Sequence, residues 1–189
     1  MKAEGVIKRE YPDPELMALV AKGDKVAFRE LSDRYLKMIY AVAFRMFPEK
    51  ADADDVVQDA LVRLWNKAGA WDAKAGASVS TWIYRITYNI AIDHKRRQKA
   101  GHVPLPDHAE SDAPDPEMAL RRQEERQYVR AAVESLPERQ RAALVLCHFE
   151  GLSNAQAAEI MDTTVKSVEG LLVRARKTLK DTLIAYKKA

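Results

Sequence analysis

Residues 135–180 read SLPERQRAALVLCHFEGLSNAQAAEIMDTTVKSVEGLLVRARKTLK, and this stretch decides the fold. Within it, Ser153 and Gln156 have the spacing of a capping box, which predicts a short helix after residue 153. The sequence Asp-Thr-Thr at 162–164 interrupts that helix, and its last threonine suits the N-cap of a second helix beginning at Val165. Two short helices joined by a tight turn predict a helix-turn-helix.

The second helix of this motif is amphipathic. Its apolar residues recur at intervals of three and four and are expected to be buried: Val165, Val168, Leu171, Leu172, Ala175 and Leu179. Its other face carries the candidate contacts to a DNA major groove: Lys166, Ser167, Glu169, Gly170, Val173, Arg174 and Lys177. Helical hairpins with solvated charges are common, so the motif alone leaves a purely structural role open.

The composition is that of a helical globular protein. Of the 189 residues, 47% are hydrophobic and 31% are charged, and the seven glycines and few β-branched runs favour an all-α fold. The single cysteine, Cys147, excludes an intrachain disulfide and is expected to be a buried thiol. Because no second cysteine or helical histidine pair accompanies it, we expect no metal site. The amino terminus has no long apolar segment, so the sequence predicts a cytoplasmic protein without membrane insertion.

The charge distribution divides the chain. Residues 1–99 hold 18 Lys and Arg against 14 Asp and Glu, residues 100–135 hold 4 against 8, and residues 136–189 hold 9 against 6. Residues 100–116 also contain four prolines and no Lys or Arg, a composition that cannot bury enough surface to fold alone. We therefore predict two small helical domains joined by a flexible, acidic, Pro-containing linker. The expected ranges are a tail at 1–14, a first domain at 15–99, the linker at 100–117 and a helix-turn-helix domain at 118–189.

Apolar periodicity and helix-capping residues predict the remaining helices. In the first domain we expect helices from Asp13 to the break at Gly23, then over about 25–47, 52–67 and 81–99, the last capped by Ser80 or Thr81. Before the helix-turn-helix we expect helices over about 117–135 and 137–147. No strand pattern of any length is present in the sequence.

The helix over 52–67 carries an acidic patch formed by Asp54, Asp55, Gln58 and Asp59. Acidic residues near a helix amino terminus favour the helix dipole, and this explains the first acids of the segment. A docking surface for a basic protein partner explains the patch equally well, and the spacing alone leaves both interpretations open.

A loop and the helix that follows it form a second candidate surface. Trp71 either anchors the loop on the core or, with the polar residues around it, contacts unstacked bases. On the following helix, Arg85, Tyr88, Asn89 and Arg96 are expected along the flank away from the core, and the helix ends in the basic run 94–99. Aromatic and amide groups interleaved with arginines favour a nucleic-acid surface over a plain basic helix end.

Taken together, three motifs in order resemble the bacterial sigma-70 family, in its extracytoplasmic-function (ECF) subgroup. The first is ADDVVQD at 53–59 with RLW at 63–65, and the second is TWIYRI at 81–86 with Asn89 and DHKRR at 93–97. The third is LPERQR at 136–141 with EGLS at 150–153 and RAR at 174–176. The resemblance covers about residues 15–180 and rests on three ordered matches, which are more specific than any one of them.

The resemblance implies a sigma factor that binds core RNA polymerase and directs promoter recognition, melting and transcription initiation. It implies that the acidic patch binds polymerase and that the last helix reads the minus-thirty-five element. It assigns minus-ten recognition and melting to Trp71, Asp72, Lys74, Ser78, Ser80, Arg85, Tyr88, Asn89, Arg96 and Arg97. It also implies control by an anti-sigma factor, a monomer when free of partners, and neither a cofactor nor catalytic residues.

Two alternatives and one departure accompany this interpretation. A free-standing helix-turn-helix regulator explains the last helix but neither the acidic patch nor the loop. An enzyme is disfavoured because the sequence has no phosphate-binding glycine loop and no nucleophile–base arrangement.

Many family members carry a basic or hydroxyl residue where this chain has Glu169 or Gly170. A glycine here costs the helix up to about 1 kcal/mol, so either a close approach to DNA or a close helix crossing is expected to require it.

Overall fold

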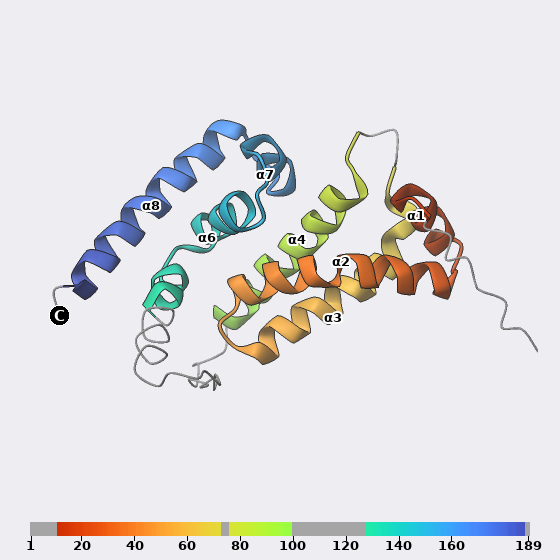
Figure 1. Cartoon of the computed structure of the whole chain (residues 1–189), viewed down its shortest axis with the longest axis horizontal. Helices are drawn as coiled ribbons and strands as arrows, with labels where there is room; N and C mark the ends of the chain where they lie inside the picture. Colours follow the sequence, from red (N-terminus) through yellow and green to blue (C-terminus); the bar gives the residue numbers. More distant parts are fainter. Residues whose placement is uncertain (1–10, 73–75, 100–127, 188–189) are drawn as a thin grey trace, which may run out of the picture.

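The computed structural model describes residues 11–72, 76–99 and 128–187 (Figure 1). Every regular element within these residues is helical, which confirms the all-α prediction. None of the described helices combines the length and the apolar character needed to cross a membrane.

Four helices and one short turn form the amino-terminal half: α1 (Asp13–Ala21), α2 (Lys25–Met46), α3 (Lys50–Lys67), the 3-10 turn η1 (Ala68–Ala70) and α4 (Val79–Lys99). Helices α2, α3 and α4 pack against one another, and α1 lies at the far end of the group (Figure 1). The core between them is apolar and includes Leu31, Ile39, Val56, Leu64 and Ile83.

Two side chains set the starts of the longer helices. Asp24 caps α2, since its Oδ1 accepts hydrogen bonds from the backbone N–H of Val26 at 2.8 Å and of Ala27 at 3.0 Å. The cap of α4 is Ser78, whose Oγ accepts from the backbone N–H of Thr81 at 3.1 Å. The predicted cap at Ser80 or Thr81 was therefore wrong, and α4 begins earlier than expected.

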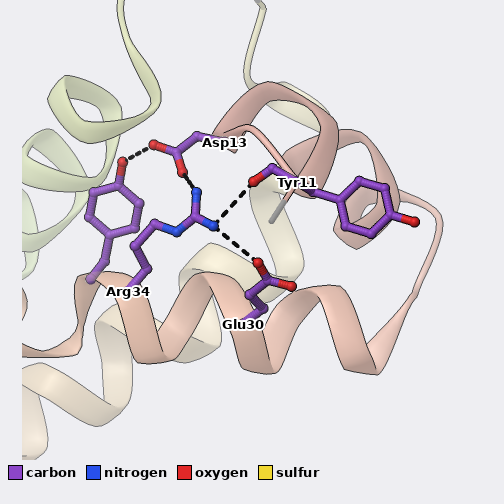
Figure 2. A network of polar contacts seen from close by, with 5 residues as sticks. Tyr11, Asp13, Glu30 and Arg34 are labelled. Atoms are coloured by element: carbon purple, nitrogen blue, oxygen red, sulfur yellow. Dashed lines mark hydrogen bonds and ion pairs between the residues drawn. The ribbon is translucent and has the colours of Figure 1, made fainter. Parts of the chain in front are cut away.

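A polar network fixes the beginning of α1 on α2 (Figure 2). The Asp13 carboxylate accepts hydrogen bonds from the guanidinium of Arg34 and from the hydroxyl of Tyr35. Arg34 also donates to the Tyr11 carbonyl at 3.1 Å and to Glu30 at 3.0 Å. Burial and the Asp13 charge both raise the pKa of Tyr35, so its hydroxyl stays a donor across the physiological range.

The carboxy-terminal half contains a helical segment over 128–134, then α6 (Glu138–Leu144), the π-helical turn η3 (Val145–Phe149), α7 (Asn154–Ile160) and α8 (Val165–Lys187). The helix expected over 137–147 is thus α-helical only to Leu144 and continues as a π turn. Most of the helix expected over 117–135 lies outside the described residues.

The helix-turn-helix formed by α7 and α8 confirms the decisive prediction. Ser153 and Gln156 make both bonds of the capping box, with the Ser153 hydroxyl accepting at 3.2 Å and the Gln156 amide oxygen accepting at 2.9 Å. Asp162 ends α7 with a φ of 48°, the left-handed conformation that Asp tolerates better than most residues. The backbone N–H of Thr163 closes this turn on the Ala158 carbonyl at 3.0 Å.

The two halves share one apolar core. Helix α7 packs on α4, and α2 contacts η3 and α6, so the buried cluster runs without a break from α1 into α8 (Figure 1). The sequence left the relative arrangement of the halves open, and the structure shows them closed on each other. Two smaller expectations were wrong: Val165 is exposed at the start of α8, and Cys147 is half-buried.

Replacing Asp24 with alanine tests the capping account of α2. Losing the side-chain acceptor leaves two amide donors of the first turn unpaired, so Asp24→Ala should destabilise the fold by about 1 kcal/mol. That corresponds to a Tm lower by about 2–4 °C in thermal denaturation. Asp33→Ala, which removes an exposed carboxylate in the middle of the same helix, is the control. Equal Tm changes in the two variants would contradict the assignment.

Candidate functional site

The candidate minus-thirty-five surface is the outer face of α8. Val168, Leu171, Leu172 and Ala175 are buried, so the helix packs through one face, and Val173 on the other is 64% exposed. Thr164 caps the helix, because its Oγ1 accepts from the Ser167 backbone N–H at 3.1 Å. The structure leaves the remaining predicted contacts exposed, with Gly170 intermediate: Lys166, Ser167, Glu169, Val173, Arg174 and Lys177.

Gly170 has no packing partner that requires a glycine. A Cβ built on it would meet only the guanidinium of Arg174, whose nearest atom, Nη1, lies 3.5 Å away. This is ordinary contact with the end of a flexible side chain of the same helix. No close helix crossing therefore explains Gly170 within the described structure, and an approach by DNA is the remaining explanation of the two that the sequence offered.

The acidic patch lies on the outer face of α3. Asp54, Asp55, Gln58 and Asp59 are exposed, while the opposite face of α3 is buried in the core. Because α3 begins at Lys50, two residues earlier than expected, its first turn contains only Asp52 among the acids. The helix-dipole effect fades within the first turn, so it does not account for the patch, and the docking interpretation is favoured.

Sequence reasoning missed Val62 beside this patch. Its side chain is 52% exposed and it follows Gln58 by four residues and Asp59 by three, which places the three on one face of α3. The sequence contained a signal for it, because Val62 is an apolar residue that does not fall on the buried face of α3, where apolar residues recur at intervals of three and four. An exposed valine next to carboxylates gives a docking surface an apolar contact as well as charge.

The loop before α4 is held by its own polar groups. The Trp71 indole N–H donates to the Ala77 carbonyl at 3.2 Å, and its half-buried ring packs on the core. The Ser78 hydroxyl lies 2.8 Å from that of Ser80. These contacts fit the anchoring interpretation, and contact of Trp71 with unstacked bases stays a prediction. Asp72 is exposed, and Lys74 lies outside the described residues.

On α4, the residues predicted to contact nucleic acid form two columns along the helix, one exposed and one buried. Arg85, Asn89, Arg96 and Arg97 are exposed, and the Arg96 guanidinium lies 4.0 Å from the Asp93 carboxylate. Tyr88 was expected on the same open flank, and this was wrong: it is only 8% exposed. Burial raises the pKa of its hydroxyl, which forms a hydrogen bond with Arg139 of the carboxy-terminal half.

Two family models match the chain in the order of these surfaces. "Sigma-70 region 2" matches residues 31–101, which include α3 and α4. "Sigma-70, region 4" matches residues 126–179, which include the helix-turn-helix.

Curated relatives match along nearly the whole chain. The RNA polymerase sigma-H factor of Pseudomonas aeruginosa is 32% identical over 90% of this chain and 93% of its own length. The ECF RNA polymerase sigma-E factor of Escherichia coli is 31% identical over 92% of this chain and 95% of its own length.

Solved structures share the fold. CnrH, solved in complex with the cytosolic domain of CnrY, is 30% identical, with a TM-score of 0.65 over 92% of this chain and 97% of CnrH. The sigma factor RpoE of Bartonella quintana, solved with the anti-sigma factor NepR, has a TM-score of 0.66 over 82% of this chain and 96% of its own. At 21% identity, this second likeness concerns the fold alone.

Gly170→Ala separates helix stability from DNA contact. Alanine favours the helix by up to about 1 kcal/mol and fits the space, so Tm should rise while affinity for a selected DNA duplex falls. Thermal denaturation and fluorescence anisotropy measure the two effects. The matched control is Gly69→Ala, where the new Cβ would lie 3.7 Å from that of Ala21, far from α8 in sequence. Unchanged duplex affinity in Gly170→Ala would contradict the hypothesis that DNA closely approaches Gly170.

Proposed function

The chain belongs to the extracytoplasmic-function sigma factors of the sigma-70 family. From this premise we propose that three separate exposed surfaces bind core polymerase, the minus-ten strand and the minus-thirty-five element. The protein binds core RNA polymerase and directs it to promoters. The observation that supports the division is the presence, in one chain, of three separate exposed faces: the acidic patch of α3, the cationic column of α4 and the outer face of α8.

The α3 face is proposed to dock on polymerase. Asp54, Asp55, Gln58 and Asp59 offer carboxylates and an amide to a basic surface, and Val62 adds an exposed apolar contact. Charged rims of this kind set the rate and register of docking, while the apolar contact contributes affinity.

The loop before α4 and the exposed column of α4 are proposed to hold the opened minus-ten strand. Extruding a base from the duplex costs a few kcal/mol, roughly, and capture of the base by the protein offsets this cost. The Trp71 indole is bonded to the Ala77 carbonyl next to the start of α4, so Trp71, Ser80 and the adjacent polar groups can meet the base. Arg85, Asn89, Arg96 and Arg97 supply donors for phosphates along the helix.

The outer face of α8 is proposed to read the minus-thirty-five element in the major groove. Arg174 and Lys177 suit guanine edges or phosphates, Glu169 can accept from cytosine N4, and Val173 suits a thymine methyl group. The chemistry of nucleotide addition belongs to the polymerase, so no catalytic residue is assigned to this chain, and we place the protein in the cytoplasm with its polymerase.

We also propose that an anti-sigma factor controls the protein. The Bartonella quintana RpoE was solved with the anti-sigma factor NepR. CnrH was solved with the cytosolic domain of CnrY. A partner that covers one of the three exposed faces blocks initiation without any change in the chain's own fold.

Run-off transcription tests the function as a whole. Purified core polymerase is incubated with genomic DNA fragments, with and without the protein. Discrete transcripts that require the protein are expected, and their shared upstream sequences give both promoter elements. The absence of new transcripts, together with tight duplex binding by the protein alone, would instead establish the free-standing regulator.

Asp55→Lys tests the docking face. A lysine in the acidic patch places like charges against a basic partner, so affinity for core polymerase should fall on the order of tenfold. Because Asp55 is exposed, Tm should stay unchanged. The control, Asp181→Lys, makes the same charge change on an exposed residue of α8, and core binding is measured by fluorescence anisotropy of labelled protein. Normal core binding by Asp55→Lys would refute the docking assignment.

Arg174→Ala tests the reading helix. Core binding should be spared, while promoter-dependent transcript yield falls by about tenfold, which corresponds to about 1.4 kcal/mol and lies within the roughly 1–3 kcal/mol expected for a lost base contact. A phosphate contact would instead weaken binding to all sequences and reduce the salt slope by about 1. Arg176→Ala is the matched control, because that arginine is turned to His148, with Nη2 3.1 Å from its Nε2. Equal losses in both variants would argue against a specific role for Arg174.

A further inference from the structure

Three cationic side chains gather around the 3-10 turn η1, next to the loop before α4. Lys67 directly precedes η1, and Arg63 lies one helical turn earlier on α3. Lys22 follows α1, and its neighbour Ala21 lies against the turn, since a Cβ built on Gly69 would be 3.7 Å from the Ala21 Cβ. Lys22, Arg63 and Lys67, which we call the η1 cations, are all exposed.

No acidic side chain pairs with the η1 cations among the residues that the structure describes. Within that part of the chain their side chains form no hydrogen bond and no ion pair. Arg34, by contrast, is bonded to both Asp13 and Glu30 at the start of α1 (Figure 2). Asp24, two residues after Lys22, is engaged in capping α2. The charges of the η1 cations are therefore available to an anionic partner.

The helix dipole explains part of this placement. Cations are favoured at the carboxyl end of a helix, where Lys22 follows α1 and Lys67 occupies the last turn of α3. The effect fades within that turn, so it does not account for Arg63. It also does not account for the meeting of two such helix ends beside one loop. The cations offset the partial negative charge of both ends, which would otherwise repel a phosphate group.

The loop before α4 has cations on both of its sides. The chain runs from Lys67 through η1 into the loop, and α4 begins after it at Val79, with the exposed Arg85 in its second turn. Helix α4 lies on one side of the loop, and α1, which contacts η1, lies on the other (Figure 1). A strand that follows the exposed column of α4 to the loop and continues in the same direction therefore meets the η1 cations.

The surface around η1 suits the backbone of a single strand. Gly69 and Ala70 of the turn are exposed and small, so no large side chain stands between the cations. Proteins that hold single strands combine a positively charged track for the phosphates with separate contacts for the bases. The η1 cations supply such a track, and the loop before α4 supplies the proposed base contacts. An acidic protein surface would also attract these charges, but their continuity with the loop favours the strand.

We propose that the η1 cations bind phosphates of the opened strand where it leaves the loop before α4 towards the start site. Melting extends from the minus-ten element to the start site, so the strand is single-stranded on this side of the captured base. Phosphate contacts carry no sequence information, but they fix the register of a strand on the protein. Lys22, Arg63 and Lys67 are therefore positioning residues, and this role rests on the proposed minus-ten function of the loop.

Salt-dependent strand binding by the assembled polymerase tests the η1 cations. With the protein bound to core polymerase, fluorescence anisotropy measures affinity for two single-stranded oligonucleotides, one ending at the minus-ten element and one continuing to the start site. On the longer strand, Lys22→Gln and Lys67→Gln should each reduce the slope of log affinity against log salt by about 0.7, the loss of one phosphate contact. On the shorter strand both should match wild type. Lys37→Gln, the same charge change at an exposed residue of α2, is the matched control and should change neither slope.

Three results would overturn the proposal. The first is a slope on the longer strand that is the same in Lys22→Gln and Lys67→Gln as in Lys37→Gln. The second is an equal reduction on both strands, which would place the contact within the minus-ten element. The third is weaker binding of the labelled variants to core polymerase, which would assign the cations to an acidic protein surface.

Abasic sites test the minus-ten role separately. Each base of the shorter strand is replaced in turn by an abasic site, and affinity for wild-type protein bound to core polymerase is measured again. If no replacement weakens binding, the loop captures no base and its proposed role fails. The slopes on the longer strand still decide whether the η1 cations bind phosphates.

Discussion

The position of α4 between the two halves constrains the rest of the structure. Its Ile83 and Ile90 face α2 and α3, and its Tyr84 and Tyr88 face the carboxy-terminal half. A helix packed on two sides keeps only a narrow free column, and on α4 that column carries the exposed arginines. Which residues of α4 are exposed is therefore decided by the packing of both halves, and not by the helix alone.

Local chemistry explains why much of the fold could be predicted. Helix caps act over three residues and apolar periodicity over one or two turns, so the cap at Ser153 and most of the buried face of α8 were predicted from the sequence. The exposure of the acidic patch followed for the same reason. At the start of α4 the sequence offers several hydroxyls in a row: the prediction chose Ser80 or Thr81, and the structure uses Ser78.

The larger misses have a common physical cause, because they depend on residues far away in the chain. Arg45 and Glu150 are separated by 105 residues, and Arg141 and Met46 by 95, so no periodicity connects them. The burial of Tyr88 follows from those contacts and reversed its expected exposure. The π turn at Val145 was not predicted either, and the residues at its end, Phe149 and Glu150, contact Arg45 of α2.

The seam between the two halves combines polar contacts with a shared apolar core. Its specific contacts are an ion pair, a tyrosine hydroxyl and arginines on helix-end carbonyls, and these groups find good partners in water once they separate. Buried ion pairs gain little net stability, because desolvation offsets most of their attraction. The polar contacts therefore fix which residues of the two halves meet, while the apolar core that the halves share contributes the larger part of the free energy that holds them together.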